Sequence, residues 1–140
     1  MNNNVIVENS VAIHIRRTDY LKLGSIHHVL DLVYYQRAIE YIKTNVANPV
    51  FYVFSDDMNF VHENFSIENF RILNYSGKNG SLFDFLAIKR CNHHIIANST
   101  FSWWAAWLNK NINKTIIAPK KWLAHDKDIN PILPSQWIKF

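Results

Sequence analysis

Residues 11–19 read VAIHIRRTD, a short apolar run that ends in a dense group of charges. The apolar part, Val11–Ile15, has the length and composition of a buried strand. Because side chains alternate along a strand, His14 and Arg16 point to one face and the two isoleucines to the other. Two guanidinium groups leaving a hydrophobic strand are unfavourable unless they meet anions. The segment therefore predicts a buried strand with an anion-binding group at its carboxyl end.

Further apolar runs alternate along the chain with longer segments of helical period. This alternation is typical of a parallel sheet with crossover helices. The predicted strands are Val11–Ile15, Val50–Phe54, Phe70–Leu73, His94–Ala97 and Thr115–Ala118. We therefore expect one doubly wound α/β domain over residues 1–140, with a parallel sheet of about five strands and flanking helices. In such a sheet, ligands bind beyond the carboxyl ends of the strands.

The segments between the predicted strands indicate helices. Periodicity places Val33 on the buried stripe of the first, and Phe83 and Leu86 on that of the third. The tail, which contains Trp122 and Trp137, is expected to wrap the domain as a helix or a loop. The expected helices cover Leu32–Val46, 55–65, 81–90 and 99–109.

Length and composition restrict the class of protein. The chain has 140 residues, 49% of them hydrophobic, 14% aromatic and 19% charged, which favours one folded domain over disorder. Its net charge of +4 favours anionic partners without choosing among them. No apolar run reaches the roughly 20 residues that span a bilayer. Since Met1–Asn4 is polar and no leader is visible, we expect a cytoplasmic protein.

The chain has only three glycines, so neither a GxGxxG turn nor a Walker loop can form. A second segment, ANSTFSWW at 97–104, offers another way to bind phosphate, because a strand there runs into a helix. The hydroxyls of Ser99 and Thr100, the free amides of the first turn and the helix dipole would together bind an anion. Ordinary helix capping by either hydroxyl is the alternative. The spacing of Trp104 and Trp107 favours packing in the core or against another domain over sugar stacking.

Acidic residues occur at two further strand ends. Asp84 comes early in a predicted helix, where a carboxylate accepts paired N–H donors such as those of guanine; a dipole-favoured cap is the alternative. Asp56 and Asp57 could hold a divalent cation, but adjacent aspartates after a strand more often form a cap and a turn. No third hard ligand is placed to help, and the histidine pairs lack metal-ligand spacing. We therefore expect no metal.

Four segments together resemble the α-1,2-fucosyltransferase family, glycosyltransferase family 11: HIRRTDYL at 14–21, YYQRAI at 34–39, FSDD at 54–57 and HIIANSTFSWWAAWL at 94–108. The likeness implies inverting, metal-independent transfer of L-fucose from GDP-fucose to the 2-hydroxyl of a terminal galactose. It also implies a GT-B scaffold of two Rossmann-like halves, of which this chain would be the donor half, with the acceptor half absent. We accordingly expect GDP binding without transfer, no cofactor, and peripheral association of the full-length protein with the inner face of the membrane. The partners implied are GDP-fucose and a galactose-terminated oligosaccharide.

The resemblance also implies roles for individual residues. His14 and Asp84 match positions that recognise guanine, and Arg16 matches the main pyrophosphate ligand, with Arg17 as its supporting neighbour. Asp19 is the nearest candidate for the catalytic base, or it orients one arginine by an ion pair, since the predicted loop from residue 20 to residue 30 carries no glutamate. The other donor-binding positions are Asn98, Ser99, Thr100 and Ser102.

Alternatives of other classes stay open at this point. The net charge and the aromatic residues are compatible with a nucleic-acid-binding α/β domain, although the lysines are scattered and most aromatics follow a buried periodicity. A non-catalytic nucleotide-sugar-binding module is the third possibility. At the level of single residues, Arg17 and Asp19 could form a plain surface salt bridge, and His14 could be an ordinary core histidine.

Overall fold

The computed structural model describes residues 7–140 except 25 and 67, so the stretch Met1–Asn4 lies outside the described residues. The strands are β1 Ser10–Ile15, β2 Val50–Ser55, β3 Phe70–Ile72, β4 His93–Ile95, β5 Ile116–Ala118 and β6 Ile138–Lys139. The helices are α1 Thr18–Lys22, α2 Leu32–Asn45, α3 Met58–Asn64, α4 Gly80–Arg90 and α5 Thr100–Trp107. None of these described helices is long and apolar enough to cross a bilayer.

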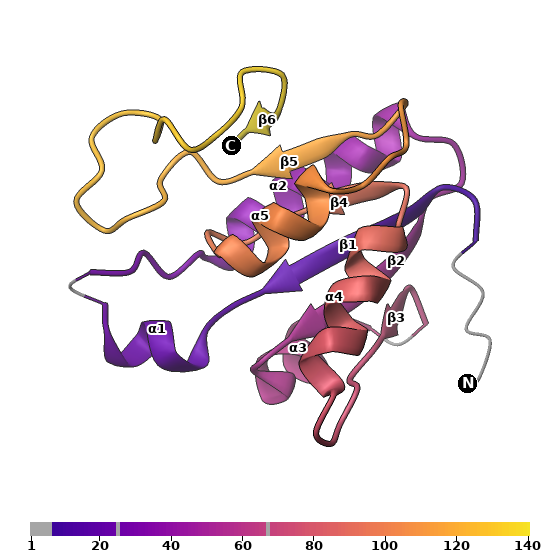
Figure 1. The fold of residues 1–140 in the computed structure, drawn as a ribbon, viewed down its shortest axis with the longest axis horizontal. Coiled ribbons are helices and arrows are strands. Elements are labelled where there is room, and N and C mark those ends of the chain that lie inside the picture. The colour runs from indigo at the N-terminus through magenta and orange to yellow at the C-terminus, as the bar shows by residue number, and fades with distance from the viewer. Residues whose placement is uncertain (1–6, 25, 67) are drawn as a thin grey trace.

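All strands belong to one parallel sheet with the order β3-β2-β1-β4-β5-β6 (Figure 1). β1 is central, and its Ile13 pairs with Val53 of β2 on one side and with Ile95 of β4 on the other. The chain therefore reverses its direction of travel across the sheet between β1 and β4. The five predicted strands are confirmed. The two-residue β6 was not predicted, and it adds a sixth strand at the edge next to β5.

The helices form a layer on each face of this sheet. α2 and α3 pack against one face, where Val11, Ile13 and Ile15 of β1 are buried. α4 and α5 cover the other face, which includes Ala12 of β1, and they lie in front of the strands in Figure 1. Alternation along β1 thus places His14 on the side of α4 and α5, as predicted, where its ring lies 5.5 Å from that of Phe101.

Helix α2 differs from the prediction only in its first turn, because Ala38, Ile39 and Ile42 lie in the core as expected. Val33 is 56% exposed, so its expected burial is wrong, whereas Tyr34 and Tyr35 point inward. The tyrosine hydroxyls account for this first turn, because they donate hydrogen bonds to strand-end carbonyls. Tyr34 Oη donates to Ile96 O at 2.7 Å and Tyr35 Oη to His14 O at 3.1 Å. These hydrogen bonds attach α2 to the carboxyl ends of β1 and β4.

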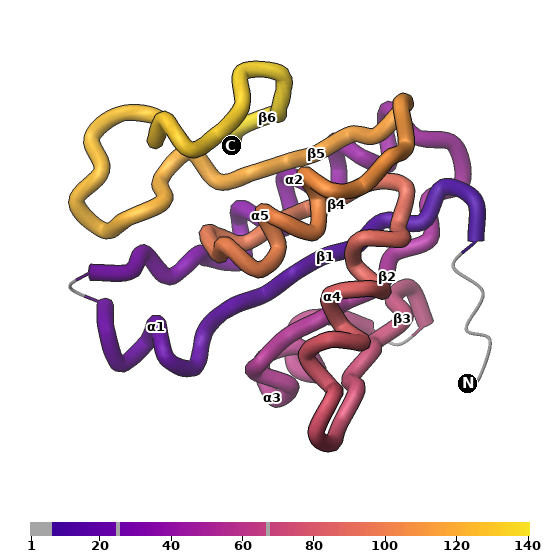
Figure 2. The backbone as a smooth tube through the Cα atoms, in the orientation of Figure 1, coloured from indigo at the N-terminus to yellow at the C-terminus, as the bar shows by residue number. Residues whose placement is uncertain are grey.

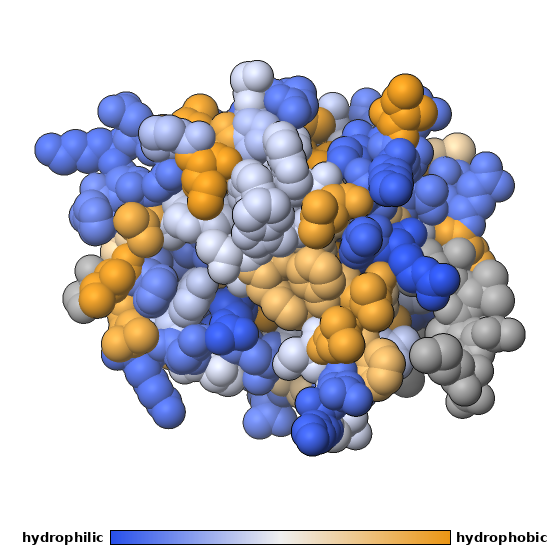
Figure 3. All heavy atoms as spheres, viewed as in Figure 1, coloured by the Kyte–Doolittle hydropathy of each residue, from blue (hydrophilic) through white to orange (hydrophobic). Residues whose placement is uncertain are grey.

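Helix α4 also differs from its predicted orientation. Phe83 and Leu86 are 38% and 42% exposed, so the prediction that they point inward is wrong. Phe85 and Ile88 pack against the sheet instead. The helix begins at Gly80, which lies against the Tyr75 carbonyl and thereby sets its rotation. Figure 3 shows the resulting apolar side chains gathered over α4 on the solvent-facing side.

The tryptophans of α5 form an aromatic surface. Trp104 and Trp107 are 50% and 47% exposed, so they lie outside this domain's core, and of the two expectations packing against another domain stays a prediction. Trp103 lies between this surface and the tail, stacking on Trp107 at 5.3 Å and donating its indole N–H to Ile132 O at 3.0 Å. The tail wraps the domain as a loop, and its Trp137 is buried.

The tail and the connection between α1 and α2 lie side by side at the carboxyl edge of the sheet (Figure 2). His27 pairs with Leu123 in an antiparallel bridge. Asn98, which follows β4, joins both segments, because its Nδ2 donates to His28 O at 2.7 Å and to Trp122 O at 2.8 Å. Asn98 therefore fixes the two segments, around His28 and Trp122, that lie beside the end of β4.

The close approach of Gly80 to Tyr75 makes this glycine a test of the start of α4. A Cβ at Gly80 would run into the Tyr75 carbonyl oxygen, whereas one at Gly24 would meet nothing nearer than 3.9 Å. We predict that Gly80→Ala lowers the free energy of unfolding by about 1–3 kcal/mol, as overpacking does. Gly24→Ala should leave it unchanged or raise it by up to about 1 kcal/mol. Urea denaturation measures the free energy of unfolding of both variants. Equal changes in the two would contradict the close approach of Gly80 to the Tyr75 carbonyl.

The two buried bonds of Asn98 predict a large loss of stability when its side chain is removed. Asn98→Ala leaves two carbonyl oxygens without their donor, at about 1–3 kcal/mol for each. Asn45→Ala is the matched control, since Asn45 Nδ2 donates at 2.8 Å to Tyr41 O on the exposed side of α2, and it should change stability by under about 0.5 kcal/mol. Hydrogen exchange of the Ala124 amide, which donates to Ile26 O, should rise in Asn98→Ala alone. Similar stability losses in both variants would refute this role.

Candidate functional site

The two motifs singled out in the sequence meet at the carboxyl ends of β1 and β4. Because the strand order reverses between these neighbours, the chain leaves them in opposite directions, which is the position at which open α/β sheets bind ligands. The phenol of Tyr20 in α1 donates to the backbone oxygen of Asn98 at 2.9 Å, which joins the two motifs directly. The contact between His14 and Phe101 joins them a second time. The predicted proximity of these segments is confirmed.

Arg16 is held by carboxylates on one edge of its guanidinium. Its Nε and Nη2 donate to Asp19 Oδ1 and Oδ2 at 3.0 and 2.8 Å, and its Nε lies 3.4 Å from Asp56 Oδ2. The hydrogen bonds that Arg16 donates to Asp19 raise the pKa of Arg16. The prediction that Asp19 orients one arginine is thus confirmed, and no described residue bonds the Nη1 end. A partly exposed guanidinium fixed in this way presents its free end to an anion.

Asp19 serves Arg16 in this arrangement. Both of its oxygens accept from that guanidinium, and the bond to Arg16 lowers the pKa of its carboxyl group. A general base acts best when its pKa is near the working pH. The geometry therefore gives Asp19 a positioning role and does not favour it as the base that deprotonates an acceptor hydroxyl.

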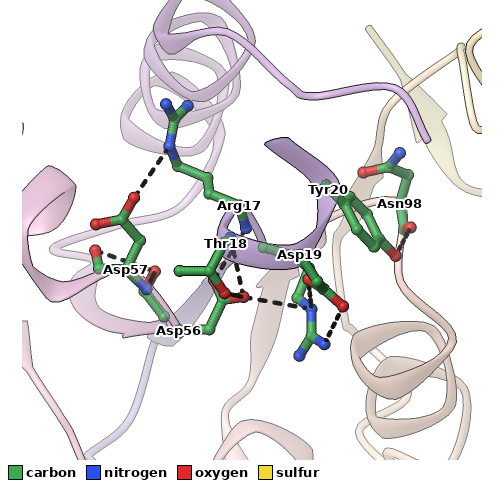
Figure 4. Close-up of polar contacts among 9 residues, drawn as sticks. Arg17, Thr18, Asp19, Tyr20, Asp56, Asp57 and Asn98 are labelled. Atoms are coloured by element: carbon green, nitrogen blue, oxygen red, sulfur yellow. Dashed lines mark hydrogen bonds and ion pairs between the residues drawn. The ribbon is translucent and has the colours of Figure 1, made fainter. Parts of the chain in front are cut away.

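The Arg17 side chain points away from Asp19 and Tyr20, toward α3 (Figure 4). Its Nε lies 3.5 Å from Asp57 Oδ2, and its guanidinium lies 3.9 Å from the ring centre of Phe60. Asp57 also caps α3, accepting from Phe60 N at 3.0 Å, which confirms the predicted cap. The alternative of an Arg17–Asp19 salt bridge is wrong, and the structure does not bring Arg17 beside Arg16.

His14 lies buried near the carboxyl end of β1. Burial lowers its pKa to about 4, so the imidazole is neutral at pH 7. Its Nδ1 is buried and has no hydrogen-bond partner among the described residues, a feature that it shares with the core residue His94. The Phe101 ring contacts both His14 and Phe85, with centroids 5.5 Å apart in each case. Neither phenylalanine was identified as a site residue from the sequence, although Phe101 lies within the second motif.

Asp84 directly precedes Phe85 on α4, and one of its carboxylate oxygens has no partner among the described residues. The carboxyl group is half-buried, and this burial raises its pKa to about 6. Its Oδ1 is buried with no hydrogen-bond partner in the described part of the chain. A carboxylate in this state is well suited to accept N–H donors from a ligand.

The first turn of α5 contributes backbone amides. Ser99 is the N-cap residue, but its side chain makes no capping bond, so the alternative of ordinary capping is wrong for Ser99. Thr100 is exposed at the first helical position. Ser102 is fully buried, with its Oγ 3.5 Å from Ala97 O and 3.4 Å from Ser99 O. Ser99 and Thr100 therefore lie where an anion would bind, whereas Asn98 and Ser102 bond backbone carbonyls.

The arrangement combines two recognition elements. Arg16 and the start of α5 offer positive potential and free donors for an anionic group. His14, Phe101 and Asp84 offer an aromatic contact with a buried ring nitrogen and an unpaired carboxylate oxygen. A ligand that fits both has a flat heterocycle with N–H donors and a negatively charged group.

Comparison with known proteins agrees with these features. The family described as Glycosyl transferase family 11 matches residues 2–139. The O-antigen biosynthesis glycosyltransferase WbnK of Escherichia coli is 39% identical over 93% of this chain and 44% of its own length. The alpha-1,2-colitosyltransferase of Escherichia coli is 34% identical over 94% of this chain and 47% of its own length.

Relatives in animals are similar over a shorter part of the chain. The galactoside alpha-(1,2)-fucosyltransferase 1 of Bos taurus is 33% identical over 70% of this chain and 29% of its own length. The chain thus spans less than half the length of these curated relatives. The expected resemblance is confirmed, and the nearly complete match shows that the chain belongs to glycosyltransferase family 11.

Proposed function

We propose that this chain binds GDP-fucose and forms the donor-binding half of an inverting α-1,2-fucosyltransferase of GT-B type. The observation that carries the proposal is the placement of Arg16 and the α5 N-terminus at the point where the strand order reverses. Family membership supports a nucleotide-sugar donor and a glycan acceptor. The acceptor proposed is the 2-hydroxyl of a terminal galactose, in keeping with the names of the animal relatives.

In this proposal Arg16 and α5 act on the leaving group. As the bond between fucose and the β-phosphate breaks, negative charge grows on the phosphate oxygens. The free end of Arg16 and the first-turn amides of α5 would stabilise that charge without a metal ion. The base that deprotonates the acceptor hydroxyl would come from outside this chain, because Asp19 is held by Arg16. We therefore expect the isolated chain to bind GDP without catalysing transfer.

Base recognition in the proposal uses His14 and Asp84. The unpaired Oδ1 of Asp84 would accept from the N1 and N2 donors of guanine, a pair that adenine lacks. The unpaired Nδ1 of His14 would make a further hydrogen bond to the nucleotide. Transfer of colitose is the second candidate, because one relative is named an alpha-1,2-colitosyltransferase. Both candidates use the same residues of this chain toward the nucleotide.

The first test is the affinity of the chain for nucleotides, measured by calorimetry. GDP should bind more tightly than ADP or GMP, because only GDP offers both the guanine edge and a diphosphate. Arg16→Ala should weaken GDP binding by roughly tenfold or more, since a hydrogen bond to a charged group contributes about 1.5–3 kcal/mol. Arg37→Ala removes the same charge from α2, where Arg37 lies over Phe140, and should leave GDP affinity unchanged. Equal affinities for GDP and ADP, or equal effects of the two variants, would refute the proposal.

The pKa of Asp84, about 6, predicts how base binding depends on pH. Only the ionised carboxylate accepts two N–H donors, so protonation below pH 6 weakens binding. Guanosine affinity should fall about tenfold from pH 7 to pH 5, and Asp84→Asn should bind weakly and without this dependence. Guanosine is the probe because it has no phosphate that titrates, and His14, with a pKa of about 4, stays neutral over most of this range. A flat profile in the unsubstituted chain would contradict the role of Asp84.

A further inference from the structure

We infer that Asp56 is a positioning residue for the donor diphosphate, acting through Arg16 and the turn from β1 into α1. This inference rests on the proposed function. From the sequence, Asp56 was interpreted only as part of a cap or a cation site. The structure instead places its carboxylate beside the arginine that is proposed to bind the diphosphate.

The Asp56 carboxylate makes four contacts within that turn (Figure 4). Its Oδ1 accepts from Arg17 N at 2.9 Å. Its Oδ2 accepts from Thr18 N at 3.2 Å and from Thr18 Oγ1 at 2.7 Å, and it lies 3.4 Å from Arg16 Nε. One side chain thus binds the two successive backbone amides that follow Arg16, and it also forms an ion pair with the guanidinium.

The sheet register explains why a residue of β2 reaches this turn. Ile15, the last residue of β1, pairs with Ser55, the last residue of β2. Asp56 therefore leaves β2 beside the point at which Arg16 leaves β1. Because both strands are buried in the centre of the sheet, this juxtaposition is fixed by the core and does not depend on the loops.

The two carboxylates around Arg16 differ in how firmly they are held. The side chain of Asp19 is 47% exposed and belongs to the short helix α1, whereas that of Asp56 is 21% exposed and bound to two backbone amides. Both lie at the Nε side of Arg16, so neither contacts its Nη1. Asp56 accordingly fixes the turn that carries Arg16, Asp19 accepts the hydrogen bonds of the guanidinium, and the opposite end is left for phosphate oxygens.

Asp57 provides a matched control in the same segment. It also follows β2 and caps a helix, but it contacts Arg17 and the amide of Phe60. Asn at either position removes one negative charge. Hydrogen exchange of the Arg16 Nε–H, followed by NMR in the chain without ligand, should be several times faster in Asp56→Asn and unchanged in Asp57→Asn. Unchanged exchange in Asp56→Asn would overturn the inference whether or not the chain binds GDP.

Binding measurements then test the role toward the diphosphate. Asp56→Asn should weaken GDP binding by about tenfold and change guanosine binding by less than about twofold, as the loss of one charge-assisted contact implies. In an Arg16→Ala background, Asp56→Asn should have no further effect on GDP affinity. A similar loss for guanosine, or an undiminished loss in that background, would show a merely structural role and overturn the inference.

Two further outcomes are distinguishable. If the unsubstituted chain binds neither GDP nor inorganic pyrophosphate, the proposed function fails, while the exchange measurement still decides whether Asp56 holds Arg16. If Asp56→Asn does not fold, Thr18→Val replaces it, because Thr18 Oγ1 donates to Asp56 Oδ2 at 2.7 Å and its loss loosens only that carboxylate. Thr18→Val should speed exchange at Arg16 Nε–H and weaken GDP binding severalfold, and wild-type values for both would contradict the inference.

Discussion

The burial of β1 on both faces, at the centre of a parallel sheet, is the constraint on which the site depends. All six residues of the strand are buried, and the strand is paired along its whole length with β2 and over Val11, Ala12 and Ile13 with β4. The first charged residue after it, Arg16, can therefore emerge only at the carboxyl edge. Because the strand order reverses, the neighbour of β1 on this side is β4, and α5 begins a few residues after β4 ends. Arg16 and the N-terminus of α5 thus lie at the same edge of the sheet, beyond two neighbouring strands.

Both arginines at this edge are paired with carboxylates. Asp19 and Asp56 hold Arg16, and Asp57 lies beside Arg17, so each guanidinium has a carboxylate partner. Some buried side-chain atoms nonetheless have no hydrogen-bond partner among the described residues, among them His14 Nδ1, Asp84 Oδ1 and Arg17 Nε. Unpaired buried groups destabilise a domain, and they are tolerated where a ligand satisfies them.

The strands and the two motifs could be predicted from sequence because strands buried on both faces are continuous apolar runs. The helix orientations could not, because apolar periodicity ignores polar anchors. Val33 was expected inward, yet its neighbour Tyr34 takes the inward position in the first turn of α2, where its hydroxyl donates to Ile96 O. The direction of Arg17 depends on Asp57, forty positions later in the chain, and no local pattern contains that information. The short helix α1 likewise begins where Asp56, which follows β2, accepts from Thr18 N.

The most direct test of the central claim is a crystal structure of this chain with GDP. The diphosphate should lie against the free end of Arg16 and the first turn of α5, and the guanine should contact Phe101 between His14 and Asp84. Arg17 should stay paired with Asp57. Nucleotide bound elsewhere, for example on the exposed tryptophans of α5, and absent from the carboxyl ends of β1 and β4, would contradict the account.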